Sequence, residues 1–382
     1  MMFRAKNKYL LVNPYSGVNQ EIPNMALAYL SAYLHAGVVD LNTKKRPKNR
    51  YLDFSSDILA LSVQTRNYSN AIDIAGAYKH KYPKAEIKSI SGFIDVQCCY
   101  PFVDFNEKIE IPIDFSDQLP FPDYELFDSF AIFKKCWQSG KWQYPLMTSL
   151  GCPFQCVYCA SRNRRVKFRS VGNCREELLQ AKKRWGIRSF VVIDDCFNFS
   201  KKRVLEFCAD IASLGLPWIC ANGLRADIFD SEIAKALKKA GCWQISFGVE
   251  SSDPSVLENI KKGETIGQIE RSILIAKNFF STVNCYFIIG LPGSSYESDL
   301  ASLNWARKHK VNAFFSYYVP LDKAKDNIFY GSSAKPLSSS YPLELQEKIY
   351  RMTYCMRPFS LRDPISTWGK RFIRWIARKN LK

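Results

Sequence analysis

The sequence lacks long hydrophobic runs and contains very few histidines. No run reaches the roughly 18 uninterrupted apolar residues of a candidate spanning helix, which argues against a membrane-spanning protein. The first residues have no apolar core followed by a cleavage site, so we expect no secretion signal and a cytoplasmic location. The histidines are His35, His80 and His309, which leaves few imidazole ligands for a metal.

The sequence also has comparatively little negative charge. It contains 54 lysines and arginines against 36 aspartates and glutamates, a formal net charge of +18. A positive balance attracts anionic partners through long-range electrostatics. We interpret it mainly as a solvated lysine-rich surface, and expect an anionic or small-molecule substrate rather than nucleic acid.

Thirteen cysteines would fit a secreted disulfide scaffold in a shorter chain. Most of them stand singly inside apolar runs, as Cys208, Cys220 and Cys285 do. A cysteine in such a position behaves as a small buried hydrophobe. We therefore predict that most are reduced and structural, and that only a separate cluster carries chemistry.

Residues 1–97 alternate short apolar runs with amphipathic stretches. The predicted strands are 9–12, 58–63 and 87–90, and the predicted helices are 24–35 and 70–82. Strands that alternate with helices form a parallel sheet covered by helices. We therefore predict a small, truncated Rossmann-like βαβ domain, followed over 98–143 by a proline-broken linker.

A regular rhythm of strands and helices begins at Tyr144. The predicted strands are 145–150, 189–193, 218–221, 244–249, 283–289 and 313–319, separated by amphipathic helices at 175–185, 203–214, 231–240, 268–279 and 296–309. Six β/α units predict an α/β fold with a partial (β/α)6 TIM-type barrel over 144–335. The remaining residues, 336–382, are predicted to form a helical, basic tail.

Polar residues follow most of the predicted barrel strands. They are Cys152 after the first strand, Asp194 and Asp195 after the second, Asn222 after the third and Glu250 after the fourth. Barrels of this type carry out their chemistry at the C-terminal ends of the strands. So many polar strand ends at one mouth exceed what packing requires, and they predict the functional site there.

Three cysteines lie close together after the first barrel strand. Cys152, Cys156 and Cys159 have the spacing C-x-x-x-C-x-x-C. A structural zinc site would need a fourth protein ligand, and a disulfide cannot account for three thiols. Cysteine thiolates hold [4Fe–4S] clusters, and three of them leave one iron open. The spacing therefore predicts a [4Fe–4S] cluster whose open iron can bind a further ligand.

This motif, with an aromatic residue before its last cysteine, resembles the signature of the radical S-adenosylmethionine (SAM) superfamily. The resemblance extends to 193–197, 222–227, 248–251 and 289–293, which are similar to the motifs of the family's second to fifth strands. It implies a radical SAM barrel and an enzyme that cleaves SAM reductively at its cluster.

The resemblance also implies roles for individual residues. Cys152, Cys156 and Cys159 would ligate the cluster, and Tyr158 would pack or hydrogen-bond at the adenine of SAM. Polar contacts to SAM are implied for Asp195, Asn222, Arg225 and Glu250. The structural alternatives are that Asp194 caps the next helix and that Arg225 pairs with Glu250. We expect Asp195 and Glu250 to affect SAM binding rather than cluster assembly.

The front part of the chain is similar to the cobalamin-binding domain of one superfamily branch. The similarity lies in 10–17, 24–34 and 57–68, and the segments 119–128 and 350–358 also resemble that branch. Cobalamin is therefore a further candidate cofactor.

Two features argue against cobalamin. The predicted sheet ends near Gly92, and the sequence contains no Asp-x-His-x-x-Gly that could coordinate cobalt. A sheet of three strands offers a large cofactor few contacts. We therefore expect little or no cobalamin, with Ser62 and Thr65 chiefly structural although they follow a strong strand.

Three functions remain open at this stage. The first is a radical SAM enzyme that modifies an unactivated carbon of an unknown substrate by direct hydrogen abstraction, followed by rearrangement, cyclisation or oxidation. The second is a cobalamin-dependent radical SAM C-methyltransferase. The third is a non-enzymatic iron–sulfur sensor or scaffold, against which the polar strand ends argue.

The resemblance implies a reductant such as flavodoxin or ferredoxin as a partner. The tail offers a second contact, because residues 367–382 place apolar and basic residues on opposite sides of one predicted helix. Such a helix either packs on the barrel or makes peripheral contact with an anionic membrane surface.

Overall fold

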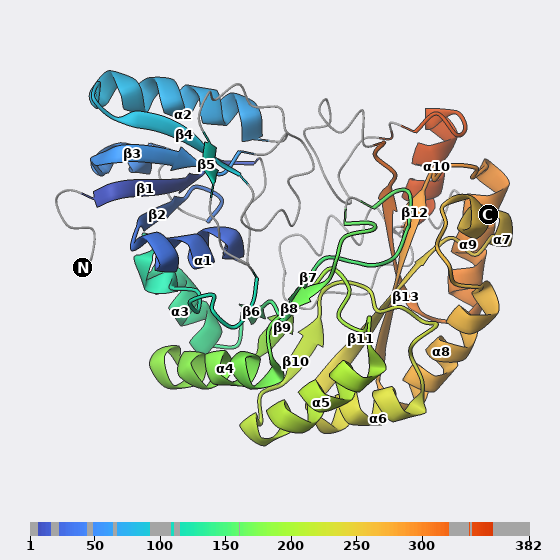
Figure 1. Cartoon of the computed structure of the whole chain (residues 1–382). Coiled ribbons are helices and arrows are strands. Elements are labelled where there is room, and N and C mark those ends of the chain that lie inside the picture. Colours follow the sequence, from blue (N-terminus) through green and yellow to red (C-terminus); the bar gives the residue numbers. More distant parts are fainter. Residues whose placement is uncertain are drawn as a thin grey trace.

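The computed structural model describes residues 7–16, 23–43, 49–63, 67–91, 108–110, 115–159, 161–320, 336 and 338–353. Thr65 and the amphipathic stretch 367–382 lie outside these residues. Figure 1 shows two separate sheets, one near the N-terminus and a larger one beyond it, each accompanied by helices.

The first sheet has five parallel strands in the order β2-β1-β3-β4-β5. They are β1 (Asn7–Asn13), β2 (Gly37–Asp40), β3 (Ser56–Leu61), β4 (Glu86–Ser91) and β5 (Lys108–Glu110), with a 3-10 turn at Arg50–Asp53. The helices α1 (Met25–Leu34) and α2 (Tyr68–Lys81) lie on opposite faces (Figure 1).

Two strands of this sheet were missed by the sequence analysis. β2 has four residues, all buried, and β5 has three residues inside the predicted linker. Such short strands give no readable alternation of apolar and polar residues. The expectation of a sheet reduced to three strands was therefore wrong, because the sheet continues to Glu110.

The second sheet is the partial barrel that the sequence predicts. Its six parallel strands follow one another in the order β13-β12-β11-β10-β9-β6. They are β6 (Tyr144–Leu146), β9 (Phe190–Val192), β10 (Trp218–Cys220), β11 (Cys242–Glu250), β12 (Thr282–Ile289) and β13 (Asn312–Tyr317). The connecting helices are α4 (Val171–Trp185), α5 (Lys201–Ile211), α6 (Ser231–Lys239), α7 (Pro254–Asn259), α8 (Ile266–Phe279) and α9 (Tyr296–Lys308), with a 3-10 turn at Ala212–Leu214 and, later, α10 (Leu343–Thr353).

A small hairpin projects from the first barrel strand. The sequence predicts one strand at 145–150, but the structure divides it into β6 and β7 (Ser149–Leu150). β7 pairs antiparallel with β8 (Lys167–Phe168), so the connection between these two strands carries the three clustered cysteines. The cysteine loop is thereby closed at its base by a strand pair.

The segment before the barrel is part of the core rather than a linker. It contains a 3-10 turn (Tyr124–Leu126) and α3 (Phe130–Gln138). Tyr124 and Trp137 are fully buried, and their rings meet edge to face at 5.2 Å. Both rings also contact Tyr144 of β6 and Trp185 of α4. Aromatic packing therefore joins residues 124–137 to the barrel.

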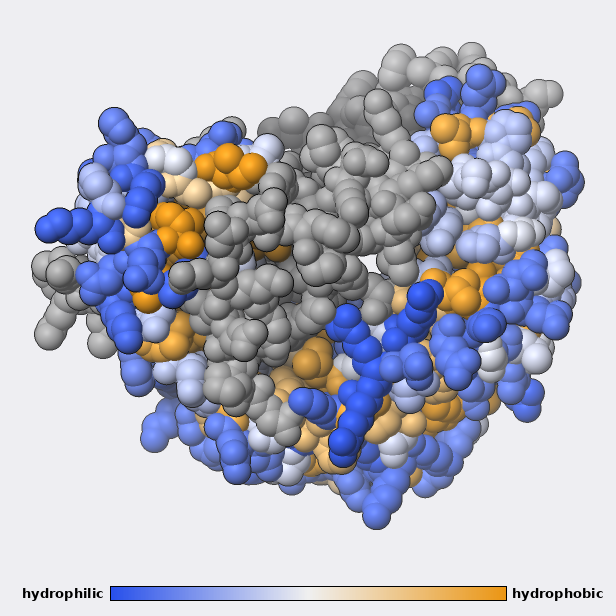
Figure 2. Space-filling view, turned by 45° about the horizontal axis from the view of Figure 1, so that its top comes forward, coloured by the Kyte–Doolittle hydropathy of each residue, from blue (hydrophilic) through white to orange (hydrophobic). Residues whose placement is uncertain are grey.

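The surface shows no single large apolar patch on the face drawn in Figure 2. Its hydrophobic residues lie in small groups among hydrophilic ones, apart from the residues drawn in grey. Within the described part of the chain, no helix combines the length and the apolar character needed to cross a bilayer.

Candidate functional site

The three clustered cysteines lie in the β7–β8 loop and are free thiols. Cys156 is buried, while Cys152 and Cys159 are partly exposed. Among the described residues, no three histidine, cysteine, aspartate or glutamate side chains converge tightly enough to hold one metal ion. A [4Fe–4S] cluster differs in that each thiolate binds its own iron, so its ligands surround a larger group. Three free thiols on one loop fit that requirement.

Two consecutive aspartates after β9 anchor the base of this loop. Asp194 is buried and accepts hydrogen bonds from Thr148 N at 2.6 Å and Ser149 Oγ at 2.7 Å. Asp195 accepts from Gly151 N at 2.8 Å and from Ser161 Oγ at 2.7 Å. The Asp195 carboxylate therefore ties together the two ends of the cysteine loop, a role that the sequence did not indicate.

Asp194 does not cap the next helix, because Ser200 caps α5 through a hydrogen bond from Arg203 N. Burial raises the pKa of Asp194, and the hydrogen bonds from Thr148 and Ser149 oppose this shift. Asp194 thus has a structural role, but it holds the start of β7 in place and does not cap a helix.

The Asp195 contacts change what we expect of a substitution there. Asp195→Asn keeps the size of the side chain but gives the two donors only one carbonyl oxygen. A hydrogen bond to a charged group contributes about 1.5–3 kcal/mol, so the loop should open more readily. We expect fewer irons per chain and faster removal of iron by a chelator.

Ser161→Ala is the matched control, because it removes only one of the two hydrogen bonds to Asp195. Its effect on iron retention should be smaller than that of Asp195→Asn. Normal iron retention in Asp195→Asn together with weakened SAM affinity would return Asp195 to the SAM contact that the resemblance implies.

Glu250 ends β11 in an unusual backbone conformation. Its φ is +65°, and the register with β12 shifts between Gly248 and Glu250. A Cβ atom on Gly248 would lie 2.6 Å from Glu250 Oε1, so only glycine leaves room for this carboxylate. A strained non-glycine residue at the end of a barrel strand is typical of a functional position.

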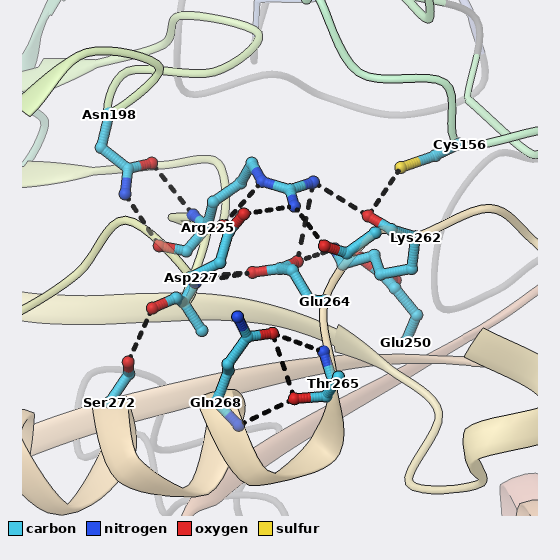
Figure 3. A network of polar contacts seen from close by, with 12 residues as sticks. Cys156, Asn198, Arg225, Asp227, Glu250, Lys262, Glu264, Thr265, Gln268 and Ser272 are labelled. Carbon is cyan, nitrogen blue, oxygen red and sulfur yellow. Dashed lines mark hydrogen bonds and ion pairs between the residues drawn. The ribbon is translucent and has the colours of Figure 1, made fainter. Parts of the chain in front are cut away.

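A buried lysine holds the Glu250 carboxylate in place. Lys262 Nζ lies 3.2 Å from Glu250 Oε1 and 3.2 Å from Glu264 Oε2 (Figure 3). Burial alone lowers the pKa of Lys262, but the two carboxylates raise it overall, so the lysine is charged. Burial and the nearby charge of Glu250 raise the pKa of Tyr158, so the residue before Cys159 lies near the end of β11.

Arg225 belongs to the same network but does not pair with Glu250. Its guanidinium binds Asp227 through two hydrogen bonds of 2.9 Å and donates to Lys262 O at 3.0 Å. It also lies 3.6 Å from the ring centroid of Phe154 in the cysteine loop. These contacts engage the guanidinium on several sides, which favours a role in supporting the loop over a direct SAM contact.

Asn222 is the most exposed of the predicted contact residues. Its Nδ2 donates to Asp194 O at 2.6 Å and to Ile193 O at 3.3 Å, so it joins the ends of β9 and β10. Within the described residues, its Oδ1 accepts no hydrogen bond. Its role as a SAM contact stays a prediction, as does that of Tyr158, which is partly buried.

The thiols of the loop differ in acidity. Burial raises the pKa of Cys156, and it raises that of Cys159 to about 11. A hydrogen bond with Cys196 lowers the pKa of Cys152 to about 7. Cluster ligands must be deprotonated, so loading with iron releases protons from Cys156 and Cys159.

Sequence analysis missed several members of the site. Lys262 and Glu264 stand in Lys-Lys-Gly-Glu, directly before the capping box of α8 that begins at Thr265. The only available signal was a pair of opposite charges in a short turn, which is usual at a surface. Nothing in the pattern shows that this turn is buried under the cysteine loop, where Cys156 Sγ lies 4.0 Å from Lys262 O.

A second polar cluster lies at the carboxyl edge of the front sheet. Asp40 is buried and accepts from Asn13 Nδ2 at 3.0 Å and from Asn42 N at 3.0 Å. Asn42 then holds the loop after β1, accepting from Ser16 N at 2.8 Å and donating to Pro14 O at 2.9 Å. Burial raises the pKa of Asp40 to about 6 against these hydrogen bonds.

This edge is the switch point of the sheet. In a parallel sheet with strand order 2-1-3-4-5, ligands bind outside the carboxyl ends of the first and third strands. Ser62 follows β3 there, is buried, and accepts a hydrogen bond from Asn67 Nδ2 at 3.0 Å through its backbone oxygen. The edge therefore carries hydrogen-bonded backbone and amide groups at the place where this topology binds cofactors.

The chain shares sequence with known methyltransferases. It is 34% identical over 208 residues to an uncharacterized methyltransferase of Pyrococcus horikoshii, covering 53% of this chain and 44% of that protein. It is 28% identical over 257 residues to cytidylyl-2-hydroxyethylphosphonate methyltransferase of Streptomyces wedmorensis, covering 62% and 46%. The chain thus spans less than half the length of these two relatives.

The overall fold is similar to that of cobalamin-dependent enzymes. The methyltransferase TsrM of Kitasatospora setae, solved with cobalamin and a [4Fe–4S] cluster, superposes with a TM-score of 0.69 at 14% identity, covering 98% of this chain and 100% of that one. OxsB, solved with aqua-cobalamin and SAM, gives a TM-score of 0.62 at 17% identity, covering 97% and 61%. Residues 146–306 match the family model of the radical SAM superfamily. Residues 146–306 therefore form a radical SAM domain, and the whole chain has a fold similar to that of TsrM and OxsB.

Proposed function

We propose that this chain is a cobalamin-dependent radical SAM methyltransferase that methylates an unactivated carbon. The observation that carries the proposal is the front sheet, whose five strands have an order that places a ligand at the β1–β3 edge. The front sheet has five strands and not three, so the argument against cobalamin from a shortened sheet no longer holds. The shared sequence with two methyltransferases favours methyl transfer over the direct hydrogen abstraction expected at first.

The residues at that edge fit a large organic cofactor. Asn42 and Asn67 hold the backbone after β1 and β3 through hydrogen bonds, which lowers the entropy that binding would cost there. Figure 1 shows that the strands of the front sheet run toward the side of the molecule on which the barrel strands end. Cobalamin bound there would supply a methyl carrier near SAM.

On the barrel side, Cys152, Cys156 and Cys159 would hold three irons of a [4Fe–4S] cluster. When bound, the cluster supplies the electron that cleaves SAM. Asp195 ties the loop that carries these thiols, and the Lys262–Glu250 pair fixes one wall of the same mouth. The chain's own residues thus position the two cofactors and need not react themselves.

Retention of cobalamin tests the proposal. Protein expressed with abundant cobalamin and purified by gel filtration should carry close to one cobalamin per chain, with its visible spectrum. Incubation with methyl-labelled SAM and a reductant should move the label onto the bound cobalamin. Protein that loads its cluster but retains no cobalamin would contradict the proposal.

A second candidate is a radical SAM enzyme that works without methyl transfer. It is favoured by a 26% identity over 175 residues to the anaerobic magnesium-protoporphyrin IX monomethyl ester cyclase of Rubrivivax gelatinosus, which covers 44% of this chain and 32% of that protein. In that case SAM cleavage should occur with no label on cobalamin.

A further inference from the structure

The segment that follows the third cysteine is strongly basic. Between Gly151 and Ser170 the sequence has five basic residues and no acidic one. The basic residues are Arg162, Arg164, Arg165, Lys167 and Arg169. Arg169 is buried, whereas Arg162, Arg165 and Lys167 are exposed.

This basic segment lies directly against the cysteine loop. Asn163 N donates to Phe154 O at 2.7 Å, and Arg164 N donates to Cys152 O at 2.9 Å. Gly151 has a φ of +97°, and a Cβ atom there would lie 2.6 Å from Arg165 O. The two stretches of backbone are therefore in contact along the loop.

The other side of the cysteine loop is occupied by the barrel. Val157 N donates to Ile260 O at 3.0 Å, and Cys156 contacts the backbone of Lys262. Among the described residues, the basic segment and the barrel therefore contact different parts of the cysteine loop.

An exposed aromatic ring continues the basic segment. Phe168 is 54% exposed, although the guanidinium of Arg203 lies 4.9 Å from its ring centroid and Phe199 lies 6.2 Å away. An apolar side chain beside exposed charges matches the core and rim of a protein interface. Complexes that transfer electrons have small interfaces and weak affinities, so a few exposed residues can form such an interface.

We propose that Arg162, Arg165, Lys167 and Phe168, called here the basic hairpin surface, dock an acidic one-electron carrier of the flavodoxin or ferredoxin class. This rests on the proposed radical SAM function, in which each SAM cleavage consumes one electron. The carrier is oxidised by one electron and the cluster is reduced. SAM then takes up that electron as its C–S bond breaks, giving methionine and the adenosyl radical.

Charge complementarity selects this partner. An acidic carrier is steered toward a basic surface, and this one lies against the loop that carries the three thiols. Nucleic acid would need basic residues along a longer stripe to neutralise several phosphates. The three exposed cations lie within six residues of one loop and its strand.

The test compares two reductants on the same reconstituted protein. The variant Arg165→Glu/Lys167→Glu reverses two charges and spares Arg162, whose guanidinium donates a hydrogen bond to Val157 O in the cysteine loop. With reduced bacterial flavodoxin, kcat/KM for SAM cleavage should fall by about tenfold or more, with a weaker dependence on salt. With dithionite, cleavage and iron content should equal those of the unchanged protein.

The matched control is Lys235→Glu/Lys239→Glu, which reverses two exposed charges on α6. It should leave flavodoxin-driven cleavage unchanged. Equal losses in both variants, or unchanged kcat/KM in the first, would overturn the docking proposal. So would loss of oligonucleotide binding without loss of flavodoxin-driven cleavage. Absence of cleavage with dithionite in the unchanged protein would instead contradict the proposed function.

Discussion

Replacing Cys152, Cys156 and Cys159 together by alanine should remove the iron, the brown colour and all SAM cleavage. The three thiols share one loop, which the β7–β8 pair closes at its base. Without thiolates the cluster has no covalent attachment to the protein. Iron analysis and the visible spectrum after anaerobic reconstitution measure the effect.

The control for this triple variant is Cys242→Ala. Cys242 is 1% exposed at the start of β11, at the opposite end of that strand from Glu250. Its loss should leave the iron content unchanged, whatever it costs in packing. A triple variant that still bound about four irons per chain would show that the cluster is held elsewhere.

Replacing Arg169 by methionine should destabilise the folded protein by about 3–5 kcal/mol, the usual result of breaking a buried ion pair from one side. Arg169 is fully buried and lies 2.5 Å from Glu177 of α4. It also donates to Tyr29 of α1 at 3.0 Å and to Met147 O at 3.1 Å. Its loss leaves the Glu177 carboxylate buried without its cation and removes a link between the two sheets' helices. Urea unfolding, followed by the fluorescence of the buried tryptophans, measures the change.

Two comparisons isolate the ionic contribution. Arg184→Met breaks an exposed pair on the same helix, with Glu125 at 2.8 Å, and should cost less than about 1 kcal/mol. The double variant Arg169→Met/Glu177→Gln removes both buried charges and keeps an acceptor for the Tyr144 hydroxyl. It should recover part of the stability lost in Arg169→Met. A loss no larger in Arg169→Met than in Arg184→Met would contradict this account.

The barrel was predictable because its helices, and its longer strands, are long enough to show their periods. β11 and β12 have nine and eight residues, and the six barrel strands appear in sequence order. The three cysteines of the cluster site are close together in the sequence, so their role could also be predicted from it. The radical SAM domain, over residues 146–306, and the fold were confirmed.

The partners of the polar site residues could not be predicted, because they are distant from these residues in the sequence. The link of Asp195 to Gly151 and Ser161 spans more than 30 residues, and that of Lys262 to Cys156 spans more than 100. Pattern analysis identifies such residues as polar but does not say which partner they meet. The structural alternative of an Arg225–Glu250 pair was wrong, because Arg225 pairs with Asp227 and Glu250 pairs with Lys262.

The aromatic contacts between α3 and α4 determine where a fragment that contains the barrel must begin if it is to be joined to another protein. A fragment that begins at Tyr144 would lack Trp137 and Tyr124, so Trp185 would lose its contacts with both rings. Each such ring buries about 150–250 Å² and contributes a few kcal/mol at about 25 cal/mol per Å². Chimeras that join this barrel to another front domain should therefore include the chain from Phe115 onward. A shorter fragment would expose aromatic side chains that are buried here, and these would favour aggregation.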